Sequence, residues 1–508
     1  MQSRLWRIIA AGMLSFALSG CPRAAQTPDH VLIQALMEPV IANLDSPAYA
    51  VSVPWGDHVV LCFRAAQGRD PSLVEFATLR MMREHPGLKR SEVLGLALAA
   101  ESDTLDWTAC RDFLASKTTD AFATNDAVRL KARALAARPA KELAAELADD
   151  DAAVEPADKS LPLGTQVPDE AYNTYFGFLH THSHFSLDAD QSGTIDEAYT
   201  VARDQAGLDF MGVTDHAEFL ILWPWDHKWE RGLAAADAHN APGEFVALYG
   251  FEWSNPVLGH VSVMNTDEFT HSLKTFRFQA LLKWLEAHPD AYAQLNHPGD
   301  FDFIGLEFGH LRHAPRAVAQ VMGMEQWNTN VGFDRYYYAG SWESDVPYID
   351  VANQRGWMLG ALGAQDNHKR DWGLLNDFRT GVLATELTRQ GLAEAFRARR
   401  FYATEDKDLL LDFRCSGYPM GARLDGVARN FTITVTDGSG DAFQEARFFK
   451  NGQPLAMQAL EGASDIAEFS DAGATGYDYY YVIVTQTDDN DNNGRNDEAL
   501  SSPIWANN

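Results

Sequence analysis

The segment Tyr175–Asp190 reads YFGFLHTHSHFSLDAD and gathers an unusual number of nitrogen and oxygen side chains. The chain has 16 histidines in 508 residues, and three of them, His180, His182 and His184, fall within this segment. The apolar run 175–179 leads into them and has the composition of a buried strand. Alternate side chains of a strand share one face, so His180 and His182 point the same way. The segment therefore predicts a strand that ends in a polar site.

Further short runs of strand composition follow, and patterns with helical periodicity separate them. With the first, the runs cover 175–179, 210–213, 245–249, 291–295, 318–324, 358–362 and 381–384, and the helical patterns include 194–207, 278–290 and 387–400. This alternation is typical of βα units, so we predict an α/β domain over 171–406 whose parallel sheet closes into a barrel. In such barrels the chemistry collects at the C-terminal ends of the strands.

Side chains that can bind metal ions follow six of these runs. They are His180, His182 and Asp188 after the first, Asp215 and His216 after the second, Glu252 and His260 after the third, His297 after the fourth, Glu325 after the fifth, and Asp366 and His368 after the sixth. One such histidine alone is more often structural, but burying so many imidazoles and carboxylates together is costly without a compensating ion. A mixed nitrogen and oxygen set without cysteine suits catalytic Zn²⁺, Mn²⁺ or Fe²⁺.

Five motifs carry a resemblance to a known family. HTHSHFSLDAD, GVTDH, GFEWS, NHP and QDNH occur in this order over about 175–405 and resemble the motifs of the PHP (polymerase and histidinol phosphatase) superfamily. The flanking LTRQGLAEAFRARRFYATED and YYYVIVTQ resemble its carbaryl-hydrolase-type (CehA/McbA) branch. The resemblance implies a distorted (β/α)7 barrel that holds two or three divalent metal ions.

The same resemblance implies a role for each candidate residue. The first ion takes His180, His182, Glu252 and Asp366, the second shares Glu252 and adds His260 and His297, and the third takes Asp188, His216 and His368. The family often has histidine where this chain has Asp188, which implies a weaker third site or a harder metal. Asp215, Glu252, Asp366 and His368 are the predicted catalytic residues, with Asp215 orienting a ligand histidine. Glu325, Lys369 and Arg370 are candidate substrate contacts, although a solvated basic pair is an equal alternative for the last two.

The metal site predicts a hydrolase. Two neighbouring cations can hold a hydroxide and clamp phosphoryl oxygens, so we expect a phosphoesterase acting on a small phosphate ester. A carboxylester, carbamate or amide hydrolase with the same metal site is one alternative, and a surface binding protein with a residual metal site is another. The formal net charge of −30 argues against binding to a nucleic-acid duplex. The sequence does not indicate an oligomeric state.

The first 21 residues, MQSRLWRIIAAGMLSFALSGC, resemble a bacterial lipoprotein signal. Arg4 and Arg7 precede an apolar core, 8–18, that is too short to span a bilayer comfortably. The core ends in Leu18-Ser19-Gly20-Cys21, which resembles a lipobox. We therefore expect residues 1–20 to be a signal peptide and Cys21 to carry lipid, which anchors the protein in the bacterial cell envelope facing the periplasm or the exterior. An ordinary secretory peptide is the alternative.

Three further regions flank the predicted barrel. Residues 21–148 predict a helical domain, in which Cys62 and Cys110 form a disulfide or remain two buried thiols. Residues 149–170 are acidic, contain scattered prolines and predict a linker. From 407 to 508 the hydrophobic pattern has a period of two, which predicts a small antiparallel β-sandwich with a hairpin turn at Asn451-Gly452.

A polar loop in this last region resembles a calcium site. In DDNDNNGRNDE, residues Asp489, Asp491, Asn493 and Asp497 occupy positions one, three, five and nine of a Ca²⁺ loop. Position twelve is Leu500 where the pattern has glutamate. We predict a structural Ca²⁺ ion here, with a polar hairpin turn as the alternative.

The lipobox yields a prediction about anchoring. Replacing Cys21 by serine removes the only atom that can accept the lipid, so the Cys21→Ser protein should leave the membrane fraction. Fractionation of cells that produce each form, followed by immunoblotting, measures this. Equal recovery of both forms from membranes would contradict the lipoprotein hypothesis.

Overall fold

The structure is a computed structural model that describes residues 166–508. Gaps in the description fall at 222–226, 256–257, 273, 276, 301–306, 329–333, 339–345, 473–476, 491–494 and 508. The predictions for the signal peptide and Cys21, for the helical domain with Cys62 and Cys110, for most of the linker and for Asp491 and Asn493 lie outside the described residues. Within the described part, no helix is both long and apolar enough to cross a membrane.

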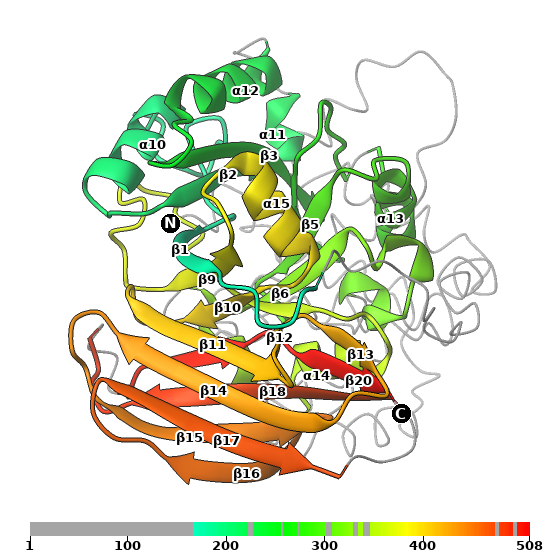
Figure 1. Ribbon diagram of the computed structural model, residues 1–508. Coiled ribbons are helices and arrows are strands. Elements are labelled where there is room, and N and C mark those ends of the chain that lie inside the picture. Colours follow the sequence, from blue (N-terminus) through cyan, green and yellow to red (C-terminus); the bar gives the residue numbers. More distant parts are fainter. Residues whose placement is uncertain are drawn as a thin grey trace, which may run out of the picture.

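One sheet of the mixed α/β structure curls into a ring (Figure 1). In spatial order its strands are β1 (Asn173–Phe178), β2 (Phe210–His216), β3 (Val246–Asn255), β4 (Gly259–Met264), β5 (Tyr292–Asn296), β6 (Val321–Asn328) and β8 (Gly360–Gly363). A parallel bridge between Thr181 and Asn367 then joins the chain beyond β8 to the chain beyond β1. The chain beyond β1 and the chain beyond β8 therefore lie side by side at the end where the predicted ligands lie.

The mixed α/β class is confirmed, but the prediction of a purely parallel sheet is wrong. β4 is antiparallel to both β3 and β5, and β9 (Arg379–Ala384) is antiparallel to β1. Only residues 256–258 separate β3 from β4. A connection this short cannot hold a crossover helix, so the second strand has to return antiparallel to the first. A sequence search for strands followed by helices overlooks such a strand.

Helices pack around the ring. They are α10 (Ile195–Asp204), α11 (Ala217–Leu220), α12 (Lys228–His239), α13 (Phe278–Glu286), α14 (Tyr348–Gln354) and α15 (Arg389–Arg397). Short 3₁₀ turns at 307–311, 315–317 and 336–338 and the two-residue strand β7 (Asp334–Arg335) complete this part. Thr194 caps α10 by accepting a hydrogen bond from Glu197 N, and Thr388 caps α15 by accepting one from Gly391 N. The helix starts thus follow local sequence.

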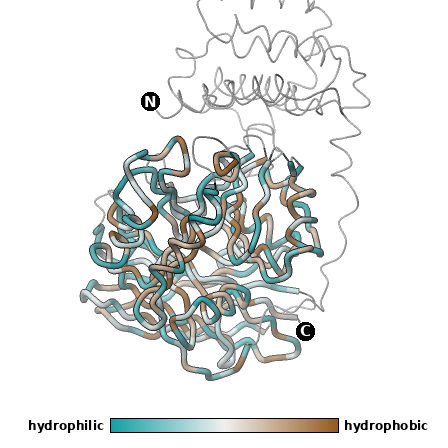
Figure 2. The backbone as a smooth tube through the Cα atoms, turned by 90° about the horizontal axis from the view of Figure 1, so that it is seen from above, coloured by the Kyte–Doolittle hydropathy of each residue, from teal (hydrophilic) through white to brown (hydrophobic). Residues whose placement is uncertain are grey.

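The C-terminal residues form two layers of mainly antiparallel strands. One contains β11 (Leu409–Cys415), β12 (Tyr418–Pro419), β14 (Arg429–Asp437) and β17 (Ser464–Asp471), and the other contains β13 (Arg423–Asp425), β15 (Phe443–Lys450), β16 (Gln453–Ala459), β18 (Tyr477–Gln486), β19 (Glu498–Ser501) and β20 (Ile504–Asn507). Buried and partly exposed residues alternate along β14, and Figure 2 shows hydrophilic and hydrophobic residues interspersed along the described backbone. Phe431 packs between Phe413 and Phe448 in the core between the layers. Asn451 and Gly452, both at positive φ, make the predicted turn between β15 and β16.

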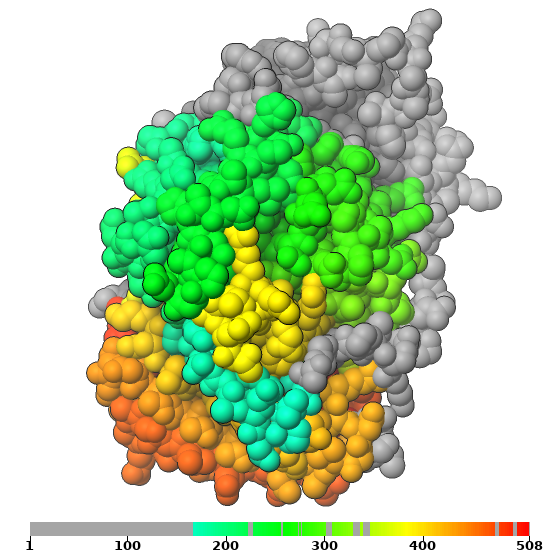
Figure 3. All heavy atoms as spheres, turned by 45° about the horizontal axis from the view of Figure 1, so that its top comes forward, coloured from blue at the N-terminus to red at the C-terminus, as the bar shows by residue number. Residues whose placement is uncertain are grey.

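The ring and the two-layered part share one continuous sheet. β10 (Phe401–Thr404) pairs with β9 on one side and with β19 on the other. Figure 3 shows α15 and the start of the described chain between the ring and the β layers. Asp350 on α14 also accepts hydrogen bonds from the hydroxyls of Tyr479 and Tyr481 on β18. Movement of one part against the other would break backbone and side-chain bonds together.

Candidate metal centre

The nine predicted metal ligands meet at one end of the ring. Eight of them are buried and His368 is half-buried. The bridge between Thr181 and Asn367 places Asp366 beside His180, and Asp366 N donates a hydrogen bond to His180 O at 3.2 Å. Asp366 has a φ of 49° and His297 a φ of 28°. Such left-handed backbone is unfavourable for residues other than glycine and is often found where a side chain is held for function.

The carboxylate of Glu252 lies at the centre of the group and is fully buried. Its Oε1 is 3.0 Å from His180 Nε2, 3.2 Å from His260 Nδ1 and 3.6 Å from His297 Nε2. Its Oε2 is 2.6 Å from His216 Nδ1. Glu252 therefore belongs to two groups of potential ligands, one with His180 and His297 and the other with His216 and His260. A carboxylate in this position can bridge two cations, because each oxygen faces a different set of nitrogens.

Three ligand atoms beside Glu252 converge without a hydrogen bond. His180 Nε2 is 3.2 Å and His182 Nε2 is 2.9 Å from Asp366 Oδ1. All three atoms are inaccessible to water, and none has a well-aligned hydrogen-bond partner. A buried polar atom without a partner is costly, whereas nitrogen and oxygen lone pairs at this separation can coordinate one cation. The donor set therefore fits a transition-metal ion.

Partners behind the two histidines select the ring nitrogens that face the cluster. Glu325 Oε1 accepts a hydrogen bond from His180 Nδ1 at 2.7 Å. Ser186 Oγ lies 3.1 Å from His182 Nδ1 and itself donates to Asp215 Oδ1 at 2.8 Å, so it accepts from the imidazole. Both rings thus carry their proton on Nδ1 and present the lone pair of Nε2 to the cluster. This is the usual arrangement of a metal-binding histidine.

Asp215 acts on the histidines through this serine. Its oxygens accept hydrogen bonds from the backbone and the hydroxyl of both Ser183 and Ser186. Ser186 Oγ also accepts from His216 N at 3.0 Å. Asp215 therefore holds the loop beyond β1 against the end of β2, and orients His182 through Ser186.

A second set of imidazoles lies on the side of His368. The ring of His182 stacks 4.3 Å from the rings of His216 and His368. Asp188 Oδ2 is 3.1 Å from His216 Nε2 and 3.6 Å from His368 Nε2. His182, His216 and His368 form a group with ligand atoms within 4.8 Å of one another. His216 thus links this group with Glu252, a closer connection than the resemblance implied.

The charges in the cluster are strongly coupled. Burial, reinforced by His368 and His216, lowers the pKa of His182 to about 4, and burial lowers the pKa of His260 to about 4. Burial opposes charge on His368 too, but Asp366 and Asp188 outweigh it and raise its pKa to about 9. Burial also opposes the charge of Glu252, yet His260, His216 and His180 hold its pKa well below the usual range. Without a metal ion, protons on some of the histidines compensate the carboxylates.

Two of the predicted substrate contacts are exposed, and the third, Glu325, lies against the ligand cluster. Glu325 is fully buried, and its oxygens accept hydrogen bonds from His180, from Gln294 Nε2 and from His297 N. We assign it an orienting role in place of substrate contact. Lys369 is exposed. The guanidinium of Arg370 pairs with Glu197 on α10, away from the nine ligands.

The sequence analysis missed several polar residues that surround Glu252. Asn296 Nδ2 donates to Glu252 Oε1 at 2.8 Å and to Ser262 Oγ at 2.9 Å. Ser254 Oγ lies 2.6 Å from His216 Nδ1 and 3.0 Å from Glu252 Oε2. The alternation of Gln294 and Asn296 in an otherwise apolar run was the available signal, since it places both amides on the face that carries the ligands.

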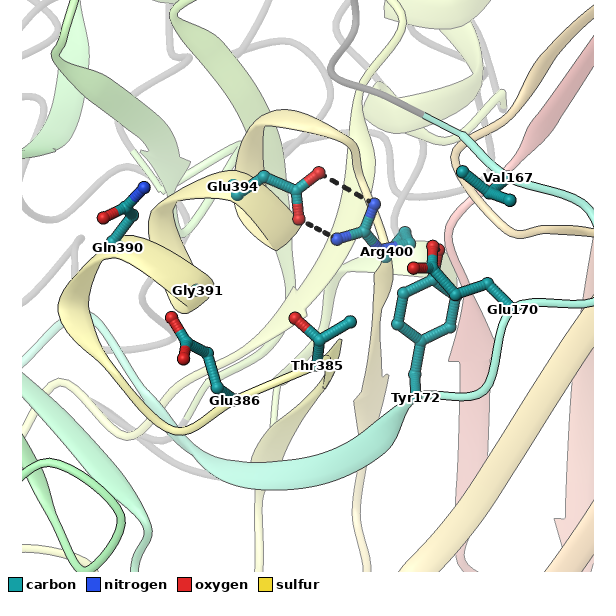
Figure 4. A pocket seen from close by; sticks show the side chains of 9 residues that line it. All are labelled: Val167, Glu170, Tyr172, Thr385, Glu386, Gln390, Gly391, Glu394 and Arg400. Carbon is teal, nitrogen blue, oxygen red and sulfur yellow. Dashed lines mark hydrogen bonds and ion pairs between the residues drawn. The ribbon is translucent and has the colours of Figure 1, made fainter.

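A separate hollow of about 270 Å³ lies at the opposite end of β1 (Figure 4). Tyr172, which precedes β1, and Thr385, which follows β9, contribute to its wall. Its charged groups pair with one another, because Arg400 binds the carboxylate of Glu394 and stacks 4.5 Å from the ring of Tyr172. The ligand cluster is therefore the stronger candidate for chemistry.

Known proteins resemble parts of this chain. A family described as "Protein of unknown function (DUF3604)" matches residues 221–281. An uncharacterized protein of Chlamydia pneumoniae is 24% identical over 384 residues, which cover 66% of this chain and 58% of that protein. The chain thus matches less than two thirds of this relative's length. A crystal structure of a two-domain protein from Bacteroides vulgatus, described as containing a predicted PHP-like metal-dependent phosphoesterase, has 14% identity and a TM-score of 0.37, with 66% of this chain and 98% of that chain covered.

The raised pKa of His368 predicts how metal binding depends on pH. In the metal-free protein this imidazole carries a proton up to about pH 9, and a metal ion has to displace that proton. The apparent affinity should therefore rise with pH, by about tenfold per unit for each proton displaced. Competition against a chromophoric chelator between about pH 6.5 and 8.5 measures the slope.

The matched variant is His368→Asn, which removes this proton but leaves the ligands around Glu252. It should show a shallower slope than the wild type. An unchanged slope would show that His368 does not exchange its proton for the metal.

Proposed function

We propose that this protein is a metal-dependent hydrolase and that its reaction is the hydrolysis of a small phosphate ester. The observation that carries the proposal is the convergence of His180 Nε2, His182 Nε2 and Asp366 Oδ1, buried and without hydrogen bonds, beside the carboxylate of Glu252. Structural metal sites usually have four closed ligands, whereas this cluster extends over nine ligand-type side chains. Such an extended set supports two or three ions and a catalytic role.

Divalent cations held by the ligands around Glu252 and by the outer histidines would supply Lewis acidity, to activate water and to polarise the ester. The protein's own part is to hold the ligands without rearrangement. Glu325 fixes the ring of His180, and Ser186 with Asp215 fixes that of His182. Because these partners are buried, the imidazoles keep one orientation through the reaction.

The half-buried His368 indicates the direction of substrate approach. His368 has the most exposed side chain of the nine ligands, at 8%, and Asp188 lies beside it, so we place the approach of the substrate on this side. Asp188 belongs only to this outer part, since its contacts are with His216 and His368. We infer that the inner ligands around Glu252 bind metal most tightly and that the outer group meets the leaving part of the ester.

Phosphate esters fit this site better than neutral esters for an electrostatic reason. The carboxylates of Asp188, Glu252 and Asp366 repel an anionic substrate unless the positive charge of bound cations exceeds their negative charge. With two or three divalent ions the local charge becomes positive, and a phosphate then gains more than an uncharged carboxylester or carbamate. The hydrolysis of a neutral ester is the competing outcome of the substrate test below.

Metal content and substrate class can be tested together. Purified protein should contain at least two equivalents of Zn, Mn or Fe per chain. The ligands form four overlapping groups, and Glu252, His180, His182 and His216 each belong to two of them. After metal loading, turnover of an aryl phosphate, a bis-aryl phosphate and an aryl ester should be compared, with and without chelator. Fewer than one equivalent after loading would contradict the metal site, and faster cleavage of the aryl ester would favour the carboxylester alternative.

Glu252→Gln tests the bridge directly. The amide keeps the shape but loses the charge and one ligand oxygen, so metal content should fall at two positions and turnover should fall by about 10²-fold or more. Asp188→Ala should be milder, because Asp188 contacts only the outer histidines. Metal analysis and steady-state kinetics measure both effects.

Asp350→Asn is a suitable control for burial and charge. Asp350 is as buried as Glu252, but it faces Tyr479 and Tyr481 on β18. A tyrosine hydroxyl can donate or accept, so the asparagine keeps partners and the variant should retain metal and turnover. If Glu252→Gln behaves like this control, or if Asp188→Ala is the more damaging change, Glu252 is not the bridge.

A further inference from the structure

A second cluster of acidic side chains lies where the ring joins the two β layers. Asp406 follows β10, Asp408 precedes β11 and Asp437 ends β14. One carboxylate oxygen of each lies within 4.8 Å of the others. Asp406 and Asp437 are buried and Asp408 is half-buried. None of the three belongs to the ligand cluster around Glu252.

Among the described residues no ion pair compensates these carboxylates, although the buried guanidinium of Arg379 acts on Asp406 at longer range. Across the residues that the structure describes, neither a lysine, an arginine nor a histidine forms an ion pair with any of the three. Asp437 Oδ1 accepts only backbone hydrogen bonds, from Gly440 N at 2.6 Å and Asp441 N at 2.8 Å. Burial, with the neighbouring carboxylates of Asp437 and Asp408, raises the pKa of Asp406 to about 8. Like charges held together away from water destabilise a fold unless a cation joins them.

Buried oxygens without hydrogen bonds lie beside the cluster. Gln486 on β18 is fully buried, and its Nε2 donates to Asp437 Oδ2 at 2.9 Å. The Oε1 of the same amide accepts no hydrogen bond. Asp408 shows the same pattern, because its Oδ2 accepts from Ser439 Oγ at 2.7 Å while its buried Oδ1 accepts none. Gln486 Oε1 and Asp408 Oδ1 thus have lone pairs that no protein donor uses.

We propose that Asp406, Asp408 and Asp437 bind a Ca²⁺ ion, with the amide oxygen of Gln486 as a further ligand. The ligand atoms are all oxygens, which selects a hard cation over the transition metals suited to the histidine cluster. Ca²⁺ accepts six to eight oxygens in irregular geometry, whereas Mg²⁺ demands a regular octahedron. The ligands come from three segments of the chain, and one of them is an amide. Such an irregular set fits Ca²⁺.

The ion ties together the elements that meet at the junction. Asp406 and Asp408 belong to the connection from the ring into the first β layer, Asp437 to that layer, and Gln486 to the second layer. Binding therefore stabilises the position of the β layers on the ring. The histidine cluster and its chemistry do not depend on this ion.

The acidic loop singled out in the sequence packs against this site. Asn490 Nδ2 donates to Asp441 Oδ2 at 2.8 Å and to Asp406 Oδ2 at 3.3 Å. Asp497 Oδ2 accepts from Asn490 N at 3.1 Å. Asp489 and Asp497 are not members of the group of three. The structure thus assigns Ca²⁺ to ligands that the loop pattern did not include.

The test uses the full chain with its histidine cluster already loaded with Zn²⁺. Titration calorimetry with CaCl₂ should show one Ca²⁺ bound per chain, and saturating Ca²⁺ should raise Tm by about 3 °C or more. Asp408→Asn should lose both responses. Its side-chain oxygen can keep the bond from Ser439, so removing the charge should leave the Ca²⁺-free Tm unchanged or higher. Asp437→Asn should lose the responses as well.

Asp425→Asn is the matched control, since Asp425 is exposed on β13 in the same part of the chain. It should keep the wild-type response to Ca²⁺. The proposal is overturned if the wild type shows no Ca²⁺ response, or if Asp408→Asn retains it. A large loss of Tm in Asp408→Asn without Ca²⁺ would also overturn it, because the carboxylate would then be structural by itself. An equal response to MgCl₂ would overturn the choice of Ca²⁺.

Discussion

Five imidazoles lie within 4 Å of one carboxylate that water does not reach. Those of His180, His216, His260 and His297 are joined by that of His182, 3.8 Å from Glu252 Oε2. So many ionisable groups can share a dry site only if protons or metal ions balance their charges. The lone pairs of His180 and His182 that converge on Asp366 without hydrogen bonds favour metal ions. The rest of the ring can be understood as the scaffold that holds this arrangement together.

That scaffold depends on how the sheet closes. The bridge between Thr181 and Asn367 brings two short motifs, His180-x-His182 and Asp366-x-His368, to the same edge although more than 180 residues separate them in the chain. The antiparallel β4 places His260 opposite Ser254 on β3, next to Glu252. Buried partners such as Glu325 and Ser186 then set the tautomer of each ring. The positive φ of Asp366 and His297 indicates that tertiary contacts offset local strain here.

The acidic cluster at the junction with the β layers differs from the cluster around Glu252 in how its charges are balanced. Around Glu252, nitrogen and oxygen ligands are mixed, and histidine protons can balance charge in the absence of metal. Around Asp406 the potential ligands are carboxylates and one amide, and without a cation the raised pKa of Asp406 lets a proton on that carboxyl balance part of the charge. The continuous sheet through β10 and β19 fixes the geometry of both clusters, so each can select its own class of cation.

Local patterns in the sequence determined a good part of this protein. The period of two in 429–437, the helical pattern of 194–207 and the turn at Asn451-Gly452 predicted elements that depend on neighbouring residues alone. The His-x-His spacing predicted that two imidazoles share a face, because strand geometry is local.

Only the tertiary structure decided which side chains meet. β4 was not predicted from the sequence. The direction of a strand depends on the strands with which it pairs, and a short sequence pattern does not indicate those partners. Glu325 followed a strand like the other candidates, yet its place behind His180 depends on the neighbour β5. Asp437 is distant in the chain from Asp406 and Asp408 and shares no motif with them, so its proximity to them arises only when the β strands pair and pack. The sequence of a segment determines which polar side chains it carries on one face. Long-range packing determines which other side chains they contact.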